Sequence, residues 1–271
     1  MTRQMKRDGA SRPLVTTFAI LGLAFLASCS ATKRGDVTGS IPGTNRPLEQ
    51  MSQPELAAVS RSVGARYEKN PRDRTAGLQY ATLLRMTGKS AQALAVMRQV
   101  AILYPSDREV LAAYGKAQAS AGDLEQALGT INRAQTPDRP DWKLKSAEGA
   151  ILDQLGRSEQ ARAAYRDALD IKPNEPSVLS NLGMSYLLTR DLKTAETYMR
   201  SAIAQPGADS RVRQNLALVV GLQGRFQEAE NIARQELTSE QAEANVAYLK
   251  AMLAQDNNWQ KLSANDDSNT N

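Results

Sequence analysis

The sequence contains no histidine and a single cysteine, and aromatic residues make up only 5% of its 271 residues. Without histidine, neither a Ser-His-Asp nor a Cys-His nucleophile system can form, and no metal can be held by histidine. A single cysteine excludes internal disulfides, CxxC redox motifs and zinc sites built from cysteines. Catalysis would have to rest on carboxylates, lysine, tyrosine or a Ser-Lys pair. No motif for such chemistry occurs, so the sequence predicts a non-catalytic protein without cofactor or metal.

The N-terminal segment combines basic residues with a short apolar run. Residues 1–13 contain four basic residues and one acid, and the fourteen residues LVTTFAILGLAFLA follow. This run is shorter than the about 20 residues of a membrane span, and the arrangement is typical of a secretory signal peptide. It ends in Leu26-Ala27-Ser28-Cys29, which resembles the bacterial lipobox. The resemblance implies removal of residues 1–28 and lipid attachment to Cys29. An ordinary signal peptide with a chance cysteine, or an uncleaved anchor, are the alternatives.

The residues after the cysteine bear on location and on charge. In lipoproteins that resemble this one, a residue such as Ser30 in place of aspartate favours the outer membrane. The implied location is the outer membrane of a Gram-negative bacterium, lipid-anchored and facing the periplasm. Cleavage removes four of 34 basic and one of 29 acidic residues, which leaves a net charge of +2. This charge does not support a nucleic-acid partner.

Residues 29–51 are polar and rich in Gly, Pro, Ser and Thr. Such a composition predicts a flexible tether with a typical reach of about 25 Å. A folded body behind this tether could stand off the membrane surface.

A 34-residue repeat organises residues 74–243. Blocks that begin at residues 74, 108, 142, 176 and 210 each carry Ala or Gly at position 8 and Ala at position 20. Position 15 is Gly in four of the five blocks, and Arg190 is the exception. Small residues at positions 8 and 20 let two helices approach closely, and Gly permits the turn between them. Proline at or near the block ends stops the second helix.

This pattern resembles the tetratricopeptide repeat (TPR), and the resemblance covers residues 74–243. It implies an all-α TPR solenoid, a right-handed superhelix of about five helix hairpins that stack because no hairpin can bury its own apolar face. Two polar residues depart from the pattern: Gln118 at position 11 and Glu148 at position 7, where large apolar residues are expected. They predict looser packing around the second and third blocks.

Capping helices are predicted at both ends of the solenoid. Residues 52–73 are expected to form the N-terminal one, because Ser52 and Glu55 make a capping box. At the other end Thr238 can begin a helix, residues 244–258 are the predicted C-terminal capping helix, and Ala251 falls in the small-residue register. Residues 259–271 are predicted to be a disordered tail.

The first helix of each TPR block lines the concave side of such superhelices, through positions 2, 5, 9, 12 and 13. In this sequence the C-terminal half of that groove is apolar with a polar edge, and Ser180 is a groove position expected to tolerate substitution. Asn181 and Asn215 are amides of the kind that fix a peptide backbone in TPR domains. The alternative is that the C-terminal capping helix folds over this surface. The candidate partner-binding groove consists of Asn181, Met184, Leu187, Arg211, Asn215, Leu218 and Leu222.

Residues 211–253 carry a second resemblance, in a Gln-Asn-Leu-Ala start, a Gln-Gly-Arg-Phe turn and an Asn-Val-Ala-Tyr-Leu helix. With the lipobox and the repeats, they resemble the TPR lipoproteins of the tight-adherence (Tad) pilus system, the TadD family. The resemblance implies a scaffold or pilotin that helps to localise or assemble the secretin channel through which Flp-type pili leave.

The implied partners are the secretin or other Tad/Flp components, and the membrane through the lipid anchor. Neither nucleic acid nor a small-molecule substrate is expected. One alternative is a TPR lipoprotein of another envelope machine, such as a type IV pilus pilotin or a component of outer-membrane barrel assembly. A more remote alternative is a cell-wall enzyme.

Overall fold

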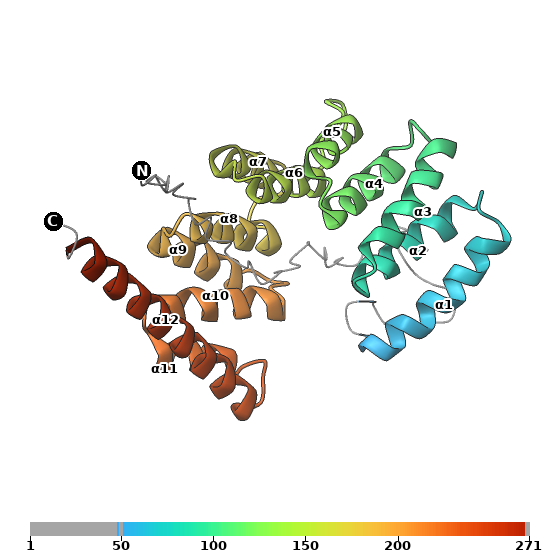
Figure 1. Ribbon diagram of the computed structural model, residues 1–271. Coiled ribbons are helices and arrows are strands. Elements are labelled where there is room, and N and C mark those ends of the chain that lie inside the picture. Colours follow the sequence, from blue (N-terminus) through green and yellow to red (C-terminus); the bar gives the residue numbers. More distant parts are fainter. Residues whose placement is uncertain (1–47, 49–50, 269–271) are drawn as a thin grey trace, which may run out of the picture.

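The computed structural model describes residue 48 and residues 51–268, with side chains up to Gln255. This part of the chain forms twelve α-helices and no β-strand (Figure 1). The helices are α1 Gln53–Lys69, α2 Arg74–Met86, α3 Ser90–Leu103, α4 Arg108–Ala121, α5 Leu124–Ala134, α6 Trp142–Gln154, α7 Ser158–Ile171, α8 Pro176–Leu188, α9 Leu192–Ile203, α10 Ser210–Leu222, α11 Phe226–Ala233 and α12 Ser239–Ser268.

The helices form two rows that follow an arc. Helices α2, α4, α6, α8 and α10 are the first helices of five hairpins, and each contacts the next one along the chain. Their partners α3, α5, α7, α9 and α11 form the second row. At the top of the arc, α4 and α6 lie on its inner side and α5 and α7 on its outer side (Figure 1). The first row is therefore the concave surface of the solenoid.

The small residues of the repeat lie where the two helices of a hairpin meet. The alanines at position 20 are at most 1% exposed in all five hairpins: Ala93, Ala127, Ala161, Ala195 and Ala229. In the fourth hairpin, a Cβ atom added at Gly183 would lie 3.0 Å from the backbone oxygen of Ala195. This burial and this close approach confirm the predicted register of the hairpins. A larger side chain at either position would push the two backbones apart.

The turns between paired helices depend on a left-handed residue at position 15. Gly88, Gly122, Gly156 and Gly224 have φ between 73° and 92°. Arg190 occupies the same place in the fourth hairpin and has φ 63°. Because this region strains residues that carry a Cβ atom, the fourth turn is less favourable than the other four.

The N-terminal end of the solenoid closes with α1, which packs on α2. The backbone N–H of Ser52 donates to Glu55 Oε2 at 2.7 Å, as expected for the predicted capping box. Leu48 and Met51 pack against the cluster of Leu56, Val63 and Leu83. Residues 49 and 50, and all of those before Leu48, lie outside the described residues, and this includes Cys29, the predicted signal peptide and most of the predicted tether.

The C-terminal end differs from the prediction in its length and register. The N–H of Gln241 donates to Thr238 Oγ1 at 3.3 Å, so Thr238 begins the helix as expected. The helix α12 then continues to Ser268, well past residue 258, because no glycine or proline interrupts residues 239–268. Residues 259–268 are therefore helical rather than a disordered tail. Ala251 is exposed, and Leu249 makes the contact with the solenoid instead.

Candidate partner-binding surface

The predicted groove residues lie on the first row, on α8 and α10. Met184 and Leu187 are half-buried and pack against a cluster that contains Leu216, Val219 and Val220 of α10. Leu218 and Leu222 are also half-buried. Beside them, at the end of α8, Leu188 is 60% exposed. We call Met184, Leu187, Leu188, Leu218 and Leu222 the apolar strip.

The two asparagines of the predicted groove connect neighbouring repeats. The side-chain N–H of Asn181 donates to Ser146 Oγ at 3.1 Å, and that of Asn215 donates to Ser180 Oγ at 3.1 Å. The two bonds join equivalent positions of successive repeats and hold neighbouring first helices in register. Ser180 is only 3% exposed. The expectation that it tolerates substitution is wrong, because it lies between two helices and accepts the bond from Asn215.

Arg211 stands at the polar edge of the groove, at the start of α10. Its guanidinium donates from Nη2 to Asp209 Oδ2 at 2.7 Å, and Asp209 also caps α10 by accepting from the N–H of Val212 at 3.2 Å. The pair therefore fixes the orientation of the arginine. Such a preoriented guanidinium suits a carboxylate or a peptide carbonyl.

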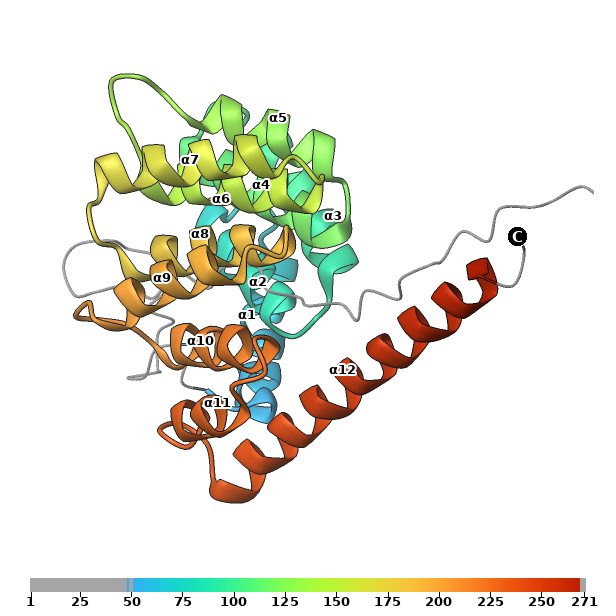
Figure 2. The same ribbon diagram turned by 90° about the vertical axis from the view of Figure 1, so that its left-hand side faces the viewer.

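The helix α12 packs at the end of the first row, and its Val246 joins the cluster on which Met184 and Leu187 pack. It contacts α10 and α11, and Ala242, Val246 and Leu249 are its buried residues. A Cβ atom added at Gly221 of α10 would lie 2.5 Å from Leu249 Cδ2. The C-terminal half of α12 projects away from the repeats (Figure 2). The strip on α8 is therefore left open by this helix.

Two residues of α12 extend the concave surface. Leu249 faces α10, whereas Lys250 lies over the ring of Phe226 on α11, at 5.1 Å. At 100° per residue, Tyr248 and Met252 lie beyond Leu249 on the side away from Lys250. They therefore continue the inner row past α10, and they are 64% and 41% exposed. The repeat register did not predict them, because α12 begins at Ser239, five residues before the expected repeat start.

A buried polar cluster supports α8 from behind. Asp153 accepts from Ser185 Oγ at 2.7 Å and from the hydroxyl of Tyr165 at 3.1 Å. Burial raises the pKa of Asp153, although these bonds and the charge of Arg162 oppose the increase. Arg162 is 7% exposed, with its guanidinium carbon 4.0 Å from the centre of the Tyr186 ring. The cluster ties α6, α7 and α8 together, so the strip rests on a rigid base.

The described residues offer a binding surface and no recognisable reaction centre. Within them, His, Cys, Asp and Glu side chains nowhere gather in threes that could hold a metal ion. No helix among them is both long enough and apolar enough to cross a membrane. What the arrangement can do is bury an apolar partner segment between polar edges.

This architecture defines a class of protein, the helical-repeat solenoids. The tetratricopeptide repeat family model matches residues 79–141 and 147–210. The chain is an all-α TPR solenoid, and this fold indicates a protein–protein interaction scaffold.

Solved structures agree with the fold. A thermophilic TPR protein of Thermus thermophilus, TTC0263, is 21% identical over 62% of this chain and 91% of its own length, with a TM-score of 0.55. A chain of the APC/C hetero-tetramer Cut9-Hcn1 is 14% identical over 75% of this chain and 40% of its own, with a TM-score of 0.57. At these identities the likeness extends to the fold alone. No curated protein matches the sequence.

Proposed function

We propose that this protein is a non-catalytic, lipid-anchored scaffold at the outer membrane that helps to assemble or localise the Tad secretin and the Flp pilus export machinery. The observation that carries the proposal is the apolar strip on the concave row, whose part on α8 is open, with Leu188 60% exposed. The lipobox at Cys29 and the resemblance of residues 211–253 to the TadD family supply the location and the system. The anchor holds the solenoid at the membrane, and the concave surface binds a secretin or pilus component.

The anchor is tested by Cys29→Ser. The first described helix begins at Gln53, 24 residues after Cys29, so we expect the substitution to leave the solenoid unchanged. We expect the variant to lose palmitate labelling and to leave the outer-membrane fraction. Continued labelling and fractionation with the outer membrane would contradict the lipoprotein assignment.

The concave surface is tested by the double variant Leu188→Asp and Leu218→Asp. Both side chains are at least partly exposed, so their charges remain hydrated and the melting temperature should change little. Co-purification of the secretin with the lipidated protein, and pilus export, should both be lost. A matched control is Ile102→Asp on α3, because Ile102 is 66% exposed but lies on the outer row. A stable double variant that retains both activities would refute the role of the strip.

A further inference from the structure

The last turn of α3 exposes two large apolar side chains on the outer row of the solenoid. Ile102 is 66% exposed and Leu103 is 41% exposed. The helix that carries them has one charged residue, Arg98, whereas α7, of the same length and also on the outer row, has five. Arg98 lies one turn before Ile102, on the same side of the helix. The solvent side of α3 is therefore more apolar than that of the equivalent helix two repeats further on.

Two more arginines lie beside the turn that follows this end of α3. Arg133 of α5 donates from Nη2 to the backbone oxygen of Pro105 at 3.5 Å. The hydroxyl of Tyr104 donates to the backbone oxygen of Arg72 at 2.7 Å. Both arginines are exposed, as is Arg98, so three cationic side chains flank the apolar end of the helix. We call this set the α3 tip: Arg72, Arg98, Ile102, Leu103 and Arg133.

The positive charge of the α3 tip is not neutralised by its surroundings. In the part of the chain whose side chains the structure describes, none of the three tip arginines forms an ion pair. Asp73 and Asp107, in the adjoining turns, cap α2 and α4 and pair with arginines of α1 and α2 at 3.6 Å and 2.7 Å. Glu68 and Lys69, both exposed at the end of α1, offset each other. The tip therefore presents apolar side chains within a net positive charge.

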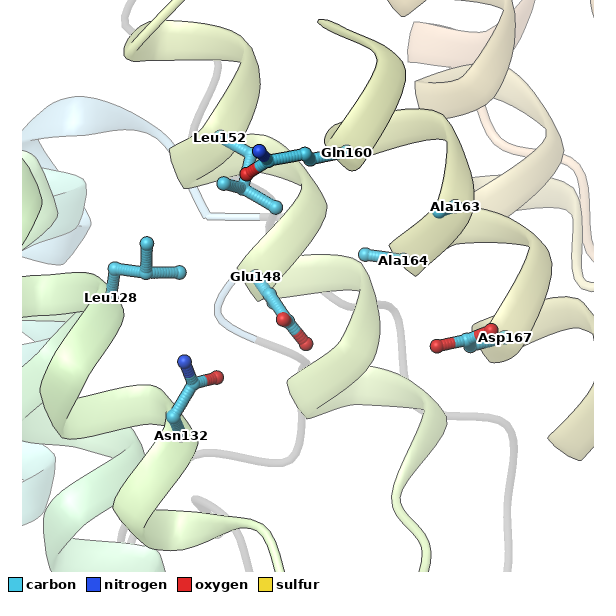
Figure 3. A pocket seen from close by; sticks show the side chains of 8 residues that line it. All are labelled: Leu128, Asn132, Glu148, Leu152, Gln160, Ala163, Ala164 and Asp167. Atoms are coloured by element: carbon cyan, nitrogen blue, oxygen red, sulfur yellow. The ribbon is translucent and has the colours of Figure 1, made fainter. Parts of the chain in front are cut away.

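Another recess of the outer row differs from the α3 tip because its charges are met within the chain. A groove of about 340 Å³ lies between α5 and α7, over α6, where Glu148 replaces the large apolar residue expected at position 7 (Figure 3). The looser packing predicted for the second and third blocks takes this form. The carboxylates of Glu148 and Asp167 each lie 3.2 Å from Lys145 Nζ. The groove therefore requires no charged partner, whereas the arginines of the tip lack one.

The shape and size of the α3 tip favour a lipid surface over a protein as its partner. The tip stands on the convex side of the solenoid, where it cannot enclose a partner segment. The exposed parts of two side chains also fall far short of the about 800 Å² that each partner buries in a standard protein interface. A membrane surface needs no enclosing groove, because apolar side chains enter its headgroup region from one side. Arginine stems then lie along the interface while their guanidinium groups reach lipid phosphates.

The tether is long enough to bring the α3 tip to the membrane. Nineteen residues lead from Cys29 to Leu48, which gives a typical reach of about 25 Å and at most about 65 Å. Leu48 packs beside the start of α1, and the turn that contains Arg72 follows the end of this helix. With 17 residues, α1 is about 25 Å long. A lipid at Cys29 and the tip can therefore reach the same bilayer.

We infer that the α3 tip docks on an anionic phospholipid surface. Ile102 and Leu103 enter the headgroup region, and the three arginines bind lipid phosphates. This contact orients the solenoid and leaves the concave row, on the opposite side, free for a protein partner. The choice of a membrane rests on the lipid anchor of the proposed function, but the contact itself can be tested without the anchor.

The position of the tip is tested in the mature chain, residues 29–271 with Cys29→Ser, which contains every described helix and no lipid. Because Cys29 is the only cysteine, Ile102→Cys can be labelled selectively with the environment-sensitive dye nitrobenzoxadiazole. The matched control is Leu188→Cys, which is 60% exposed on the concave row. With vesicles of phosphatidylethanolamine and about one-quarter phosphatidylglycerol, we expect a blue shift of the emission at residue 102 and none at residue 188. No shift at residue 102, or equal shifts at both, would overturn the inference.

Co-sedimentation with the same vesicles shows which groups carry the binding. Ile102→Asp should abolish it, and Arg98→Gln and Arg133→Gln should each weaken it about fivefold. Arg166→Gln removes an exposed arginine of α7 outside the tip and should bind as the parent does. Binding should weaken with added salt and be lost on pure phosphatidylcholine. All four side chains are exposed, so unchanged melting temperatures are expected. Equal binding to phosphatidylcholine, or full binding by the Arg98 and Arg133 variants, would refute the assignment.

A protein occupant would give a different pattern. In the lipidated protein, Ile102→Cys would then be protected from a water-soluble maleimide in native outer membranes, but its labelled form would not respond to vesicles, and this result would overturn the inference. Palmitate labelling of Cys29 tests the anchor separately, so the anchor and the tip can fail independently. Because the anchor keeps an Ile102→Asp variant at the membrane, this variant still binds its partner through the concave row.

Discussion

Replacing Ala195 by leucine should destabilise the fourth hairpin. A substitution by leucine at an exposed position of the groove should leave the stability nearly unchanged. Ala195 is fully buried, and its backbone oxygen lies where a Cβ atom at Gly183 would approach to 3.0 Å. The contact has no room for three additional carbon atoms, so α8 and α9 would have to separate. Such overpacking costs about 1–3 kcal/mol. In a chain of this size each kcal/mol lowers the melting temperature by about 2–4 °C, so we expect a fall of roughly 3–10 °C.

Circular dichroism at 222 nm measures the melting temperature, and hydrogen exchange shows where protection is lost. Because repeats contact mainly their neighbours, the loss should centre on α8 and α9. The matched control is Gln214→Leu, an exposed groove position on α10, which should shift the melting temperature by no more than about 2 °C, because surface substitutions usually change the free energy of unfolding by less than about 0.5 kcal/mol. Equal shifts for the two variants, or a uniform loss of protection, would refute the register of the helix hairpins.

Two further predictions concern the turns at position 15 and the ion pairs of Glu196. Arg190→Gly should stabilise the protein by up to about 1 kcal/mol in urea unfolding, since glycine adopts the left-handed φ of 63° without strain. Gly156→Arg should destabilise the protein by a similar amount. A less stable Arg190→Gly variant would refute this reasoning. The pKa of Glu196 is about 2 in the folded protein although burial opposes the decrease, because Arg225, Gln223 and Arg200 donate hydrogen bonds to its carboxylate. Its stabilisation, about 1 kcal/mol for ion pairs with partly exposed arginines, is present above pH 4.5 and is lost as the pH falls towards 2. Glu196→Gln should therefore flatten the acid branch of the stability curve. Identical slopes between pH 5 and 3 in the two proteins would contradict this assignment.

Much of the fold could be predicted from the sequence because the repeat signals are local. A buried alanine at position 20 and a left-handed residue at position 15 act within one hairpin, whose helices are joined by a short turn. The five copies place these residues in the same environment, which is why Ala93 and Ala229 are both buried. Arg190 was the one departure at position 15, and its positive φ shows that the turn geometry prevails over the residue type.

The candidate binding surface could be predicted only in part. The repeat register placed Leu187 and Leu218 on the first row correctly. It did not reveal that Asn215 donates an N–H to Ser180, because that bond joins residues 35 positions apart in different repeats. It also missed Tyr248 and Met252, since their orientation depends on how Leu249 meets Gly221.

The periodicity and the hairpins could be read from the sequence, as could the prediction of a lipid anchor, because each rests on neighbouring residues or on a fixed spacing. The packing of α12 and the open face of the third repeat follow from contacts between separate helices. At position 7 of the third repeat, the sequence showed Glu148 where a large apolar residue is expected. The structure showed that this carboxylate faces a groove between α5 and α7. Such features depend on how separate helices fill the space between them, and packing of that kind is a property of the assembled solenoid.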